Sequence, residues 1–179
     1  MNVEEKNFMK KVLALVLTLA LLLCSVSALA DDCKLGLGLS TAINTSKDAT
    51  AEKDGSAVVY SFIAALTVDA NGVILAADLD VLQAQVAFNA EGKLTSDLSA
   101  PALTKTEIGD GYGMKAISPI GKEYYEQLSG LEQWLIGKTA ADFKAAVEGK
   151  DETLLAVCTV SMTSMVTAVE KAVAAALAE

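Results

Sequence analysis

The stretch that decides the fold is Ala57-Val58-Val59-Tyr60-Ser61-Phe62-Ile63-Ala64-Ala65-Leu66-Thr67-Val68-Asp69. Apolar side chains occupy every second position, which is the period of a β-strand with one buried face. The residues that share this face are Val58, Tyr60, Phe62, Ala64, Leu66 and Val68. Asn71-Gly72 follows, and both residues tolerate the positive φ of a two-residue hairpin turn. The stretch therefore predicts the first arm of an antiparallel hairpin.

The chain after this turn predicts the rest of the sheet. Residues 73–81 return with apolar side chains on one face, and residues 83–89 form a third predicted strand. Glu91-Gly92 signals a second turn, which leads into a short strand at residues 93–95. We therefore expect an antiparallel sheet of hairpins over residues 57–95.

Two helices are predicted in the middle of the chain and one at its C-terminus. Residues 119–137 carry an apolar stripe at helical spacing, and Thr139 caps a second helix over residues 140–147. The last helix is rich in alanine and buries Met162, Met165 or Val166, Val169, Val173 and Leu177. The predicted fold class is α+β, with two middle helices and the C-terminal helix packed on one face of the sheet.

A row of hydroxyl groups precedes the last helix and is the first candidate ligand site. Residues 154–160 form a predicted strand, and either Ser161 or Thr163 can cap the helix that follows. Backbone N–H groups at a helix start, with hydroxyls beside them, suit an anionic group such as a phosphate. Thr159, Ser161 and Thr163 are therefore candidate cofactor-binding residues, with simple helix capping as the alternative.

A long irregular connection at residues 99–119 is the second candidate site. Its centre is Gly109-Asp110-Gly111-Tyr112-Gly113-Met114-Lys115, in which three glycines let the backbone approach a ligand closely. Tyr112 can stack on a planar ring and Lys115 can meet an anion. The alternative is a tight turn in which Tyr112 packs on the core.

The first thirty residues predict a signal peptide. Lys10 and Lys11 precede an apolar run at residues 12–23, and Ser27-Ala28-Leu29-Ala30 ends in an A-x-A cleavage pattern. An uncleaved membrane anchor is the alternative, although the run is short for a span. We expect an extracytoplasmic protein, secreted or associated with the cell envelope. Residues 31–56 then form an extended lead-in with a short strand at residues 38–44, and residues 57–179 form the domain.

Composition excludes several classes of function. The 179 residues include no histidine and no arginine, which rules out histidine triads, histidine metal sites and guanidinium clamps. After cleavage the net charge is about −10, so nucleic acid and anionic lipid are not expected partners. We expect membrane contact only through the signal peptide. A hydrolase with Ser161, Thr163 or Ser164 as nucleophile would need a base such as Lys115 or Lys122.

Two cysteines, Cys33 and Cys158, remain after the predicted cleavage. In an exported protein they can form one disulfide bond. The alternative is that Cys158 packs in the core as a small apolar residue.

Three features together resemble the extracytoplasmic FMN-binding domain. They are the exported signal, the hairpin around Val68-Asp69-Ala70-Asn71-Gly72-Val73-Ile74, and the final helix with Ala168-Val169-Glu170-Lys171-Ala172. That domain occurs in subunits of bacterial ion-pumping electron-transport complexes and in secreted flavoproteins of Gram-positive bacteria. A Ser/Thr-Gly-Ala-Thr motif before the final helix carries FMN on its last threonine through a phosphoester bond.

The resemblance places the flavin-bearing threonine at Thr159, with Ser161 at a hydroxyl that the family often has two residues later. It implies a flavoprotein with FMN that transfers electrons. The Gly-Ala of the motif falls on Val157-Cys158, and the side chain of Val157 obstructs close approach of a flavin phosphate. We therefore expect a non-enzymatic binding module for a small molecule or an envelope protein. The alternative is electron transfer with FMN at Thr159 or near Tyr112.

Overall fold

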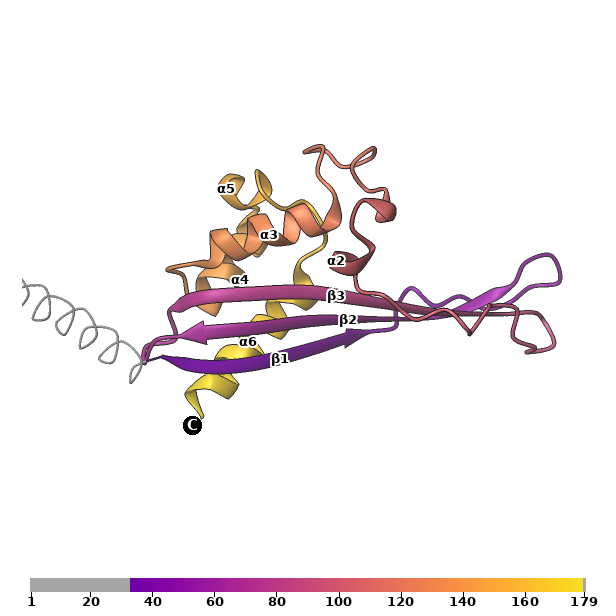
Figure 1. The fold of residues 1–179 in the computed structure, drawn as a ribbon, viewed down its shortest axis with the longest axis horizontal. Helices are drawn as coiled ribbons and strands as arrows, with labels where there is room; N and C mark the ends of the chain where they lie inside the picture. Colours follow the sequence, from indigo (N-terminus) through magenta and orange to yellow (C-terminus); the bar gives the residue numbers. More distant parts are fainter. Residues whose placement is uncertain (1–32, 179) are drawn as a thin grey trace, which may run out of the picture. The chain divides into compact units, whose positions relative to one another are not determined.

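The computed structural model describes residues 33–178, and the predicted signal peptide lies outside the described residues. Three strands form one antiparallel sheet in the order β1 (Lys34–Ala42), β2 (Gly55–Val68) and β3 (Ile74–Phe88), as Figure 1 shows. The β2–β3 turn includes Asn71-Gly72 as predicted, but it spans residues 69–73 rather than two residues, and of this pair only Gly72 has a positive φ, of 78°. Asp69 Oδ1 accepts hydrogen bonds from the N–H groups of Asn71 and Val73, which fixes this turn.

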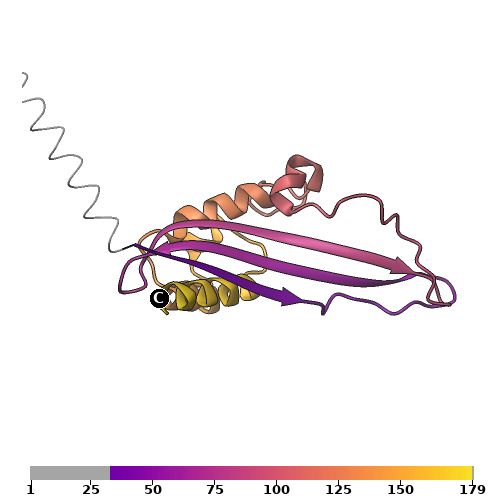
Figure 2. The same ribbon diagram turned by 60° about the horizontal axis from the view of Figure 1, so that its bottom comes forward.

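Helices cover one face and one edge of the sheet, which confirms the α+β class. The longest is α6 (Thr163–Leu177), which packs on β1 and β2, while α3 (Tyr124–Leu135) packs against β3. Figure 2 shows α6 toward the β1 edge of the sheet and α3 toward the β3 edge. The remaining elements are α2 (Lys105–Ile108), the 3-10 turn η1 (Gly109–Tyr112), α4 (Ala140–Gly149) and α5 (Glu152–Leu155). No helix within residues 33–178 is long and apolar enough to cross a membrane.

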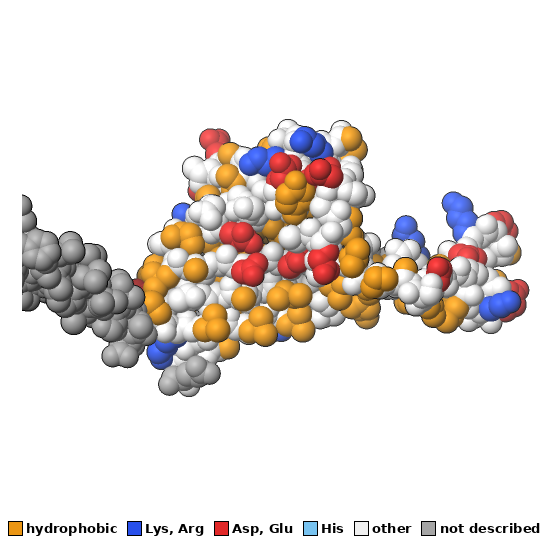
Figure 3. Space-filling model, in the orientation of Figure 1, with side chains coloured by type: hydrophobic (Ala, Val, Ile, Leu, Met, Phe, Trp, Pro, Cys, Tyr) orange, Lys and Arg blue, Asp and Glu red, His pale blue; other side chains and the backbone are white. Residues whose placement is uncertain are grey.

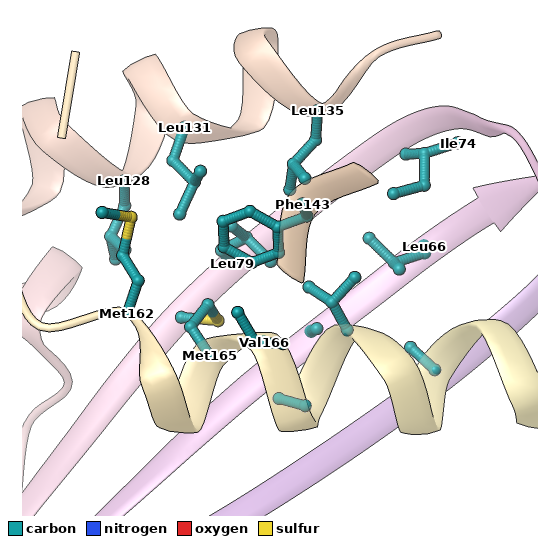
Figure 4. Packing of buried hydrophobic residues seen from close by; sticks show 14 of the residues in the cluster. Leu66, Ile74, Leu79, Leu128, Leu131, Leu135, Phe143, Met162, Met165 and Val166 are labelled. Carbon is teal, nitrogen blue, oxygen red and sulfur yellow. The ribbon is translucent and has the colours of Figure 1, made fainter. Parts of the chain in front are cut away.

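The core lies between the sheet and the helices. The alternating residues of β2 point into it as predicted, since Ala64, Leu66 and Val68 are fully buried. In Figure 4, Phe143 of α4 lies between the leucines of α3 and the side chains of Met165 and Val166 of α6. Burial of these apolar surfaces is the main favourable contribution to the stability of the fold.

Two glycines of β1 bring α6 unusually close to the sheet. A Cβ atom on Gly36 would lie 1.9 Å from the carbonyl oxygen of Ala172, and one on Gly38 would lie 1.9 Å from that of Ala168. Only glycine therefore allows this backbone contact. The other side of β1 carries leucines that point away from α6.

The strands differ from the prediction in three places. The third strand is continuous from Ile74 to Phe88, since Leu82 simply faces the other side of the sheet instead of interrupting it. The predicted strand at residues 93–95 is reduced to one isolated bridge between Phe88 and Leu94. The predicted lead-in contains β1, so the compact unit begins at Lys34.

The prediction of a strand at residues 154–160 is wrong. Asp151 accepts hydrogen bonds from the N–H groups of Thr153 and Leu154, which starts the short helix α5 in place of a strand. Leu154 and Cys158 are the fully buried residues of this run, and their spacing of four suits helical turns. The buried Cys158 carries a free thiol, and burial raises its pKa to about 11, which agrees with packing as an apolar residue.

Three details of the helices also differ. The residue that caps α6 is Met162, and no side chain caps this helix, so neither Ser161 nor Thr163 has that role. Leu177 is partly exposed, and Ala176 takes its predicted place in the buried stripe. The first middle helix begins at Tyr124 rather than at residue 119, because Glu123 forms the capping box at its start.

Candidate functional site

A cavity of about 340 Å³ lies on the helix-covered side of the sheet, beside the N-terminus of α6. Four aromatic side chains line it, Tyr60 and Phe62 of β2, Tyr112 of η1 and Tyr124 of α3, together with aliphatic and small polar residues. Segments far apart in the sequence therefore build one site. A concave pocket with an apolar lining and a few polar groups is the usual form of a small-molecule site.

The aromatic wall follows from the alternation of β2. Tyr60 and Phe62 lie on the same face as the buried core residues, but at the part of the strand that α6 does not fully cover. Their ring centroids are 6.3 Å apart and the ring planes are inclined by 25°. Tyr112 and Tyr124 meet edge to face at 5.6 Å. These geometries present ring faces and edges on which a planar ligand can stack.

Polar groups reach the cavity from the start of α6. Ser161 and Ser164 line it there, and Asn44 and Thr45 line it from the loop after β1. The first turn of α6 holds no acidic residue, and no side chain caps its N–H groups. The positive end of the helix dipole therefore faces this region without a competing carboxylate in that turn.

Lys105 places a buried cation behind the aromatic wall. Its side chain is 1% exposed, and its Nζ lies 3.5 Å from the centroid of the Tyr112 ring and 5.4 Å from that of Tyr124. Nζ donates a hydrogen bond of 2.5 Å to Gln83 Oε1, and no carboxylate among residues 33–178 forms an ion pair with it. Desolvation lowers the pKa of Lys105 to about 8. The ammonium is thus stabilised by aromatic faces and an amide instead of a countercharge.

The loop that carries Tyr112 is held by Glu123. This carboxylate is buried, and its two oxygens accept hydrogen bonds from the N–H groups of Met114 at 2.8 Å and Lys115 at 3.0 Å. The loop conformation is therefore fixed by charge-assisted hydrogen bonds. The side chain of Lys115 is exposed and does not line the cavity.

Thr159 has a structural environment. Its N–H and Oγ1 both donate to Gln127 Oε1, at 2.8 Å and 3.1 Å, and Gln127 is fully buried in α3. The amide of Gln127 in turn donates to the carbonyl of Lys122 and to Ser118 Oγ. These contacts tie the segment before α6 to α3.

The surroundings of Thr159 do not fit a flavin linked through a phosphoester. Its hydroxyl already donates to Gln127, and Thr159 does not line the cavity. The neighbouring Val157 packs tightly on α3, since a Cβ added to Gly130 would lie 3.1 Å from the Cβ of Val157. The cavity beside Tyr112 offers the open space that this position lacks.

The structure brings together Tyr112 and Ser161 from the set of candidate residues. Thr159, Thr163 and Lys115 lie outside the lining of the cavity, and Thr163 is exposed as the first residue of α6. Within residues 33–178, the hydrogen bond that Lys171 donates goes to the carbonyl of Leu39 and not to the hydroxyl of Ser161, Thr163 or Ser164. Residues 33–178 include no cluster of three or more acidic or cysteine side chains that could hold a metal ion.

Sequence reasoning missed Tyr60, Phe62, Tyr124 and Lys105 as site residues. Tyr60 and Phe62 share the alternation of the core-facing residues of β2, and Tyr124 lies within the apolar stripe of residues 119–137, so the pattern alone indicates core positions. Lys105 follows Thr104 in the run Thr104-Lys105-Thr106-Glu107, and Thr104 and Glu107 form a capping box. That motif predicts a helix that starts after Thr104, with Lys105 as its first residue.

Comparison with known proteins gives one partial similarity. No family model and no solved structure matches the chain. The chain is 32% identical over 120 residues to a chlorophenol reductase of Desulfitobacterium hafniense. The match covers 61% of this chain and 36% of that protein, so this chain spans little more than a third of the relative's length.

Proposed function

We propose that the protein is an exported, non-enzymatic binding module whose cavity takes a planar aromatic ligand with an anionic oxygen. The observation that carries the proposal is the aromatic cavity at the uncapped start of α6, with the buried ammonium of Lys105 behind Tyr112. Export is supported by the n-region, apolar run and cleavage pattern of residues 1–30.

Each part of the cavity favours one part of such a ligand. Contacts between aromatic rings contribute about 0.5–1.5 kcal/mol beyond the burial of area. An anionic group near a helix N-terminus gains about 0.3–1 kcal/mol. The hydroxyls of Ser161 and Ser164 can donate to the same oxygen. A neutral ring of the same size keeps the stacking and loses the contribution of the charge.

The test compares two probes, 2-naphthoate and the neutral 2-methylnaphthalene, by calorimetric titration of the mature protein. We expect 2-naphthoate to bind at least about tenfold more tightly, because the helix N-terminus (about 0.3–1 kcal/mol) and one hydrogen bond to a charged oxygen (about 1.5–3 kcal/mol) together exceed the roughly 1.4 kcal/mol of a tenfold difference. Ser164→Phe fills the cavity and should abolish binding. Thr163→Phe is the matched control, because Thr163 is adjacent but exposed and outside the lining. Equal affinity of the two probes, or binding by the Ser164→Phe variant, would refute the proposal.

Flavin-carrying electron transfer is the second candidate. It is supported by the resemblance to the extracytoplasmic FMN-binding domain and by the name of the similar protein, a reductase. The aromatic wall beside Tyr112 suits a flavin ring held without a covalent bond. Protein exported by its own host should then show flavin absorbance that is released on denaturation. A flavin that stays attached after denaturation, and is absent from a Thr159→Val variant, would instead support the covalent form.

A further inference from the structure

The face of the sheet opposite α6 is uncovered and partly apolar. Three leucines of β1 alternate with the glycines that contact α6, and Leu35, Leu37 and Leu39 are 70%, 67% and 51% exposed. Single exposed leucines are ordinary, but adjacent ones on the same face of one strand form a contiguous patch. Figure 3 shows this patch as a band of hydrophobic side chains along the β1 side of the sheet.

The patch continues onto β2. Leu37 is paired with Ala65 and Leu39 with Ile63, so the apolar side chains of two neighbouring strands lie side by side. Neither Ala65 nor Ile63 is buried. We call the set Leu35, Leu37, Leu39, Ile63 and Ala65 the leucine strip.

Carboxylates border the leucine strip on its β3 side. Ala65 is paired with Asp78 and Ile63 with Asp80, whose side chains lie on the open face because their neighbours Leu79 and Val81 are buried. Glu132 of α3 lies beside them, with Oε1 accepting a hydrogen bond from the N–H of Leu79.

Asp78, Asp80 and Glu132 make this border of the leucine strip negative, and no basic side chain of the described residues forms an ion pair with them. Desolvation, together with the charges of Asp78 and Asp80, raises the pKa of Glu132. Within residues 33–178 the only ion pair is Lys144–Glu170, so no lysine neutralises this row. In Figure 3 the acidic side chains near β3 have no basic side chain among them.

We propose that this face binds a partner protein through an amphipathic basic segment, whose apolar side covers the leucine strip while its lysines or arginines meet Asp78, Asp80 and Glu132. The proposal does not depend on the cavity, which lies on the other side of the sheet. Burial of apolar area provides the affinity, and the charge row sets the orientation and the choice of partner.

Two other occupants fit the charges less well. If a second copy covered all three strands face to face, the carboxylates of one copy would lie over those of the other or over the leucines. Like charges or unpaired charges in an interface are costly. An anionic lipid surface is repelled by the same row, and the chain as a whole carries a net charge of −9.

The test uses two synthetic helical peptides of leucine with lysine or of leucine with glutamate, matched in length and in the position of the leucines. The mature protein should bind the leucine–lysine peptide, with an affinity that falls as salt rises, and should not bind the leucine–glutamate peptide. A photoreactive group in the bound peptide should label residues of β1 and β2.

Three variants locate the site. Leu37→Ser should weaken binding about tenfold, since a leucine side chain no longer buries apolar area. Asp78→Asn should weaken it about threefold and reduce its salt dependence. Leu98→Ser is the matched control, since Leu98 is 60% exposed in a loop outside the sheet, and it should bind normally. Circular dichroism checks that each variant is folded.

Several results would overturn the proposal. They are equal binding of the two peptides, no binding of either, or labelling away from β1 and β2. A dimer in analytical ultracentrifugation that Leu37→Ser disrupts would show that the occupant is a second copy. Sedimentation with phosphatidylglycerol vesicles that depends on Leu37 would assign the face to a lipid surface.

Discussion

Replacing Gly38 by alanine should push α6 away from the sheet and destabilise the fold. The added Cβ would lie 1.9 Å from the carbonyl oxygen of Ala168 and 2.6 Å from the nitrogen of Ala172. Carbon–oxygen contacts between packed elements are about 3.3 Å or longer, so the two backbones must move apart by about 1.4 Å. Both obstructing atoms belong to the backbone, and no side-chain rotation can relieve the contact.

The expected cost follows from this displacement. Overpacking of a core costs about 1–3 kcal/mol, and we expect the upper part of this range because the backbones of α6 and β1 are in direct contact at both Gly36 and Gly38. The lower entropy of the unfolded alanine chain offsets about 0.4–1 kcal/mol. The net loss should be about 2 kcal/mol, which lowers the melting temperature by roughly 4–8 °C in a domain of this size.

Urea unfolding monitored by circular dichroism measures this loss directly. Gly149→Ala is the matched control, because a Cβ at Gly149 meets nothing within 4 Å at the end of α4. Its free energy of unfolding should stay the same or rise slightly, since alanine favours helix by up to about 1 kcal/mol. A Gly38→Ala variant that loses less than about 0.5 kcal/mol would show that β1 and α6 are not packed as closely as described.

Three further predictions concern buried polar groups. In the wild type, the lowered pKa of Lys105 should make the free energy of unfolding rise from about pH 8 toward 10.5, because the unfolded chain then binds more protons. Lys105→Met should remove that rise in urea titrations at several pH values, and an unchanged slope would contradict it. Gln127→Leu should cost about 1–3 kcal/mol by leaving the N–H of Thr159 unsatisfied, whereas Thr159→Val, which keeps that N–H bond, should cost about 1 kcal/mol or less. Glu123→Gln should speed amide hydrogen exchange at Met114, since an amide offers one acceptor oxygen to two N–H groups; exchange at the wild-type rate would refute this.

Periodicity predicted the parts of the fold that depend on local pattern. The alternation in residues 57–69 and the Asn71-Gly72 turn correctly gave β2 and its hairpin, and the apolar stripe in residues 119–137 gave α3, which begins five residues later than predicted. β1 was underestimated because its two buried residues, Gly36 and Gly38, are glycines, which carry no hydrophobic signal. Their function depends on α6, which follows more than a hundred residues later.

The site was harder to predict because it is made by tertiary contacts. Tyr60 and Phe62 have the same pattern as the core residues of β2, and only the end of α6 decides that they line a cavity. Thr159 has the hydroxyl that a ligand site needs, but Gln127 of α3 engages it. Sequence alone indicated that the segment before α6 belongs to a ligand site. The packing of α3 against this segment determines which of the segment's hydroxyls reach the cavity.

Native mass spectrometry of the protein exported by its own host tests the central proposal most directly, which is that the cavity beside Tyr112 holds a small aromatic ligand. The wild-type and Thr163→Phe proteins should both carry an additional non-covalent mass, and the Ser164→Phe protein should not. A wild-type protein that carries no additional mass, or the same additional mass on all three proteins, would contradict the assignment of the cavity as the binding site.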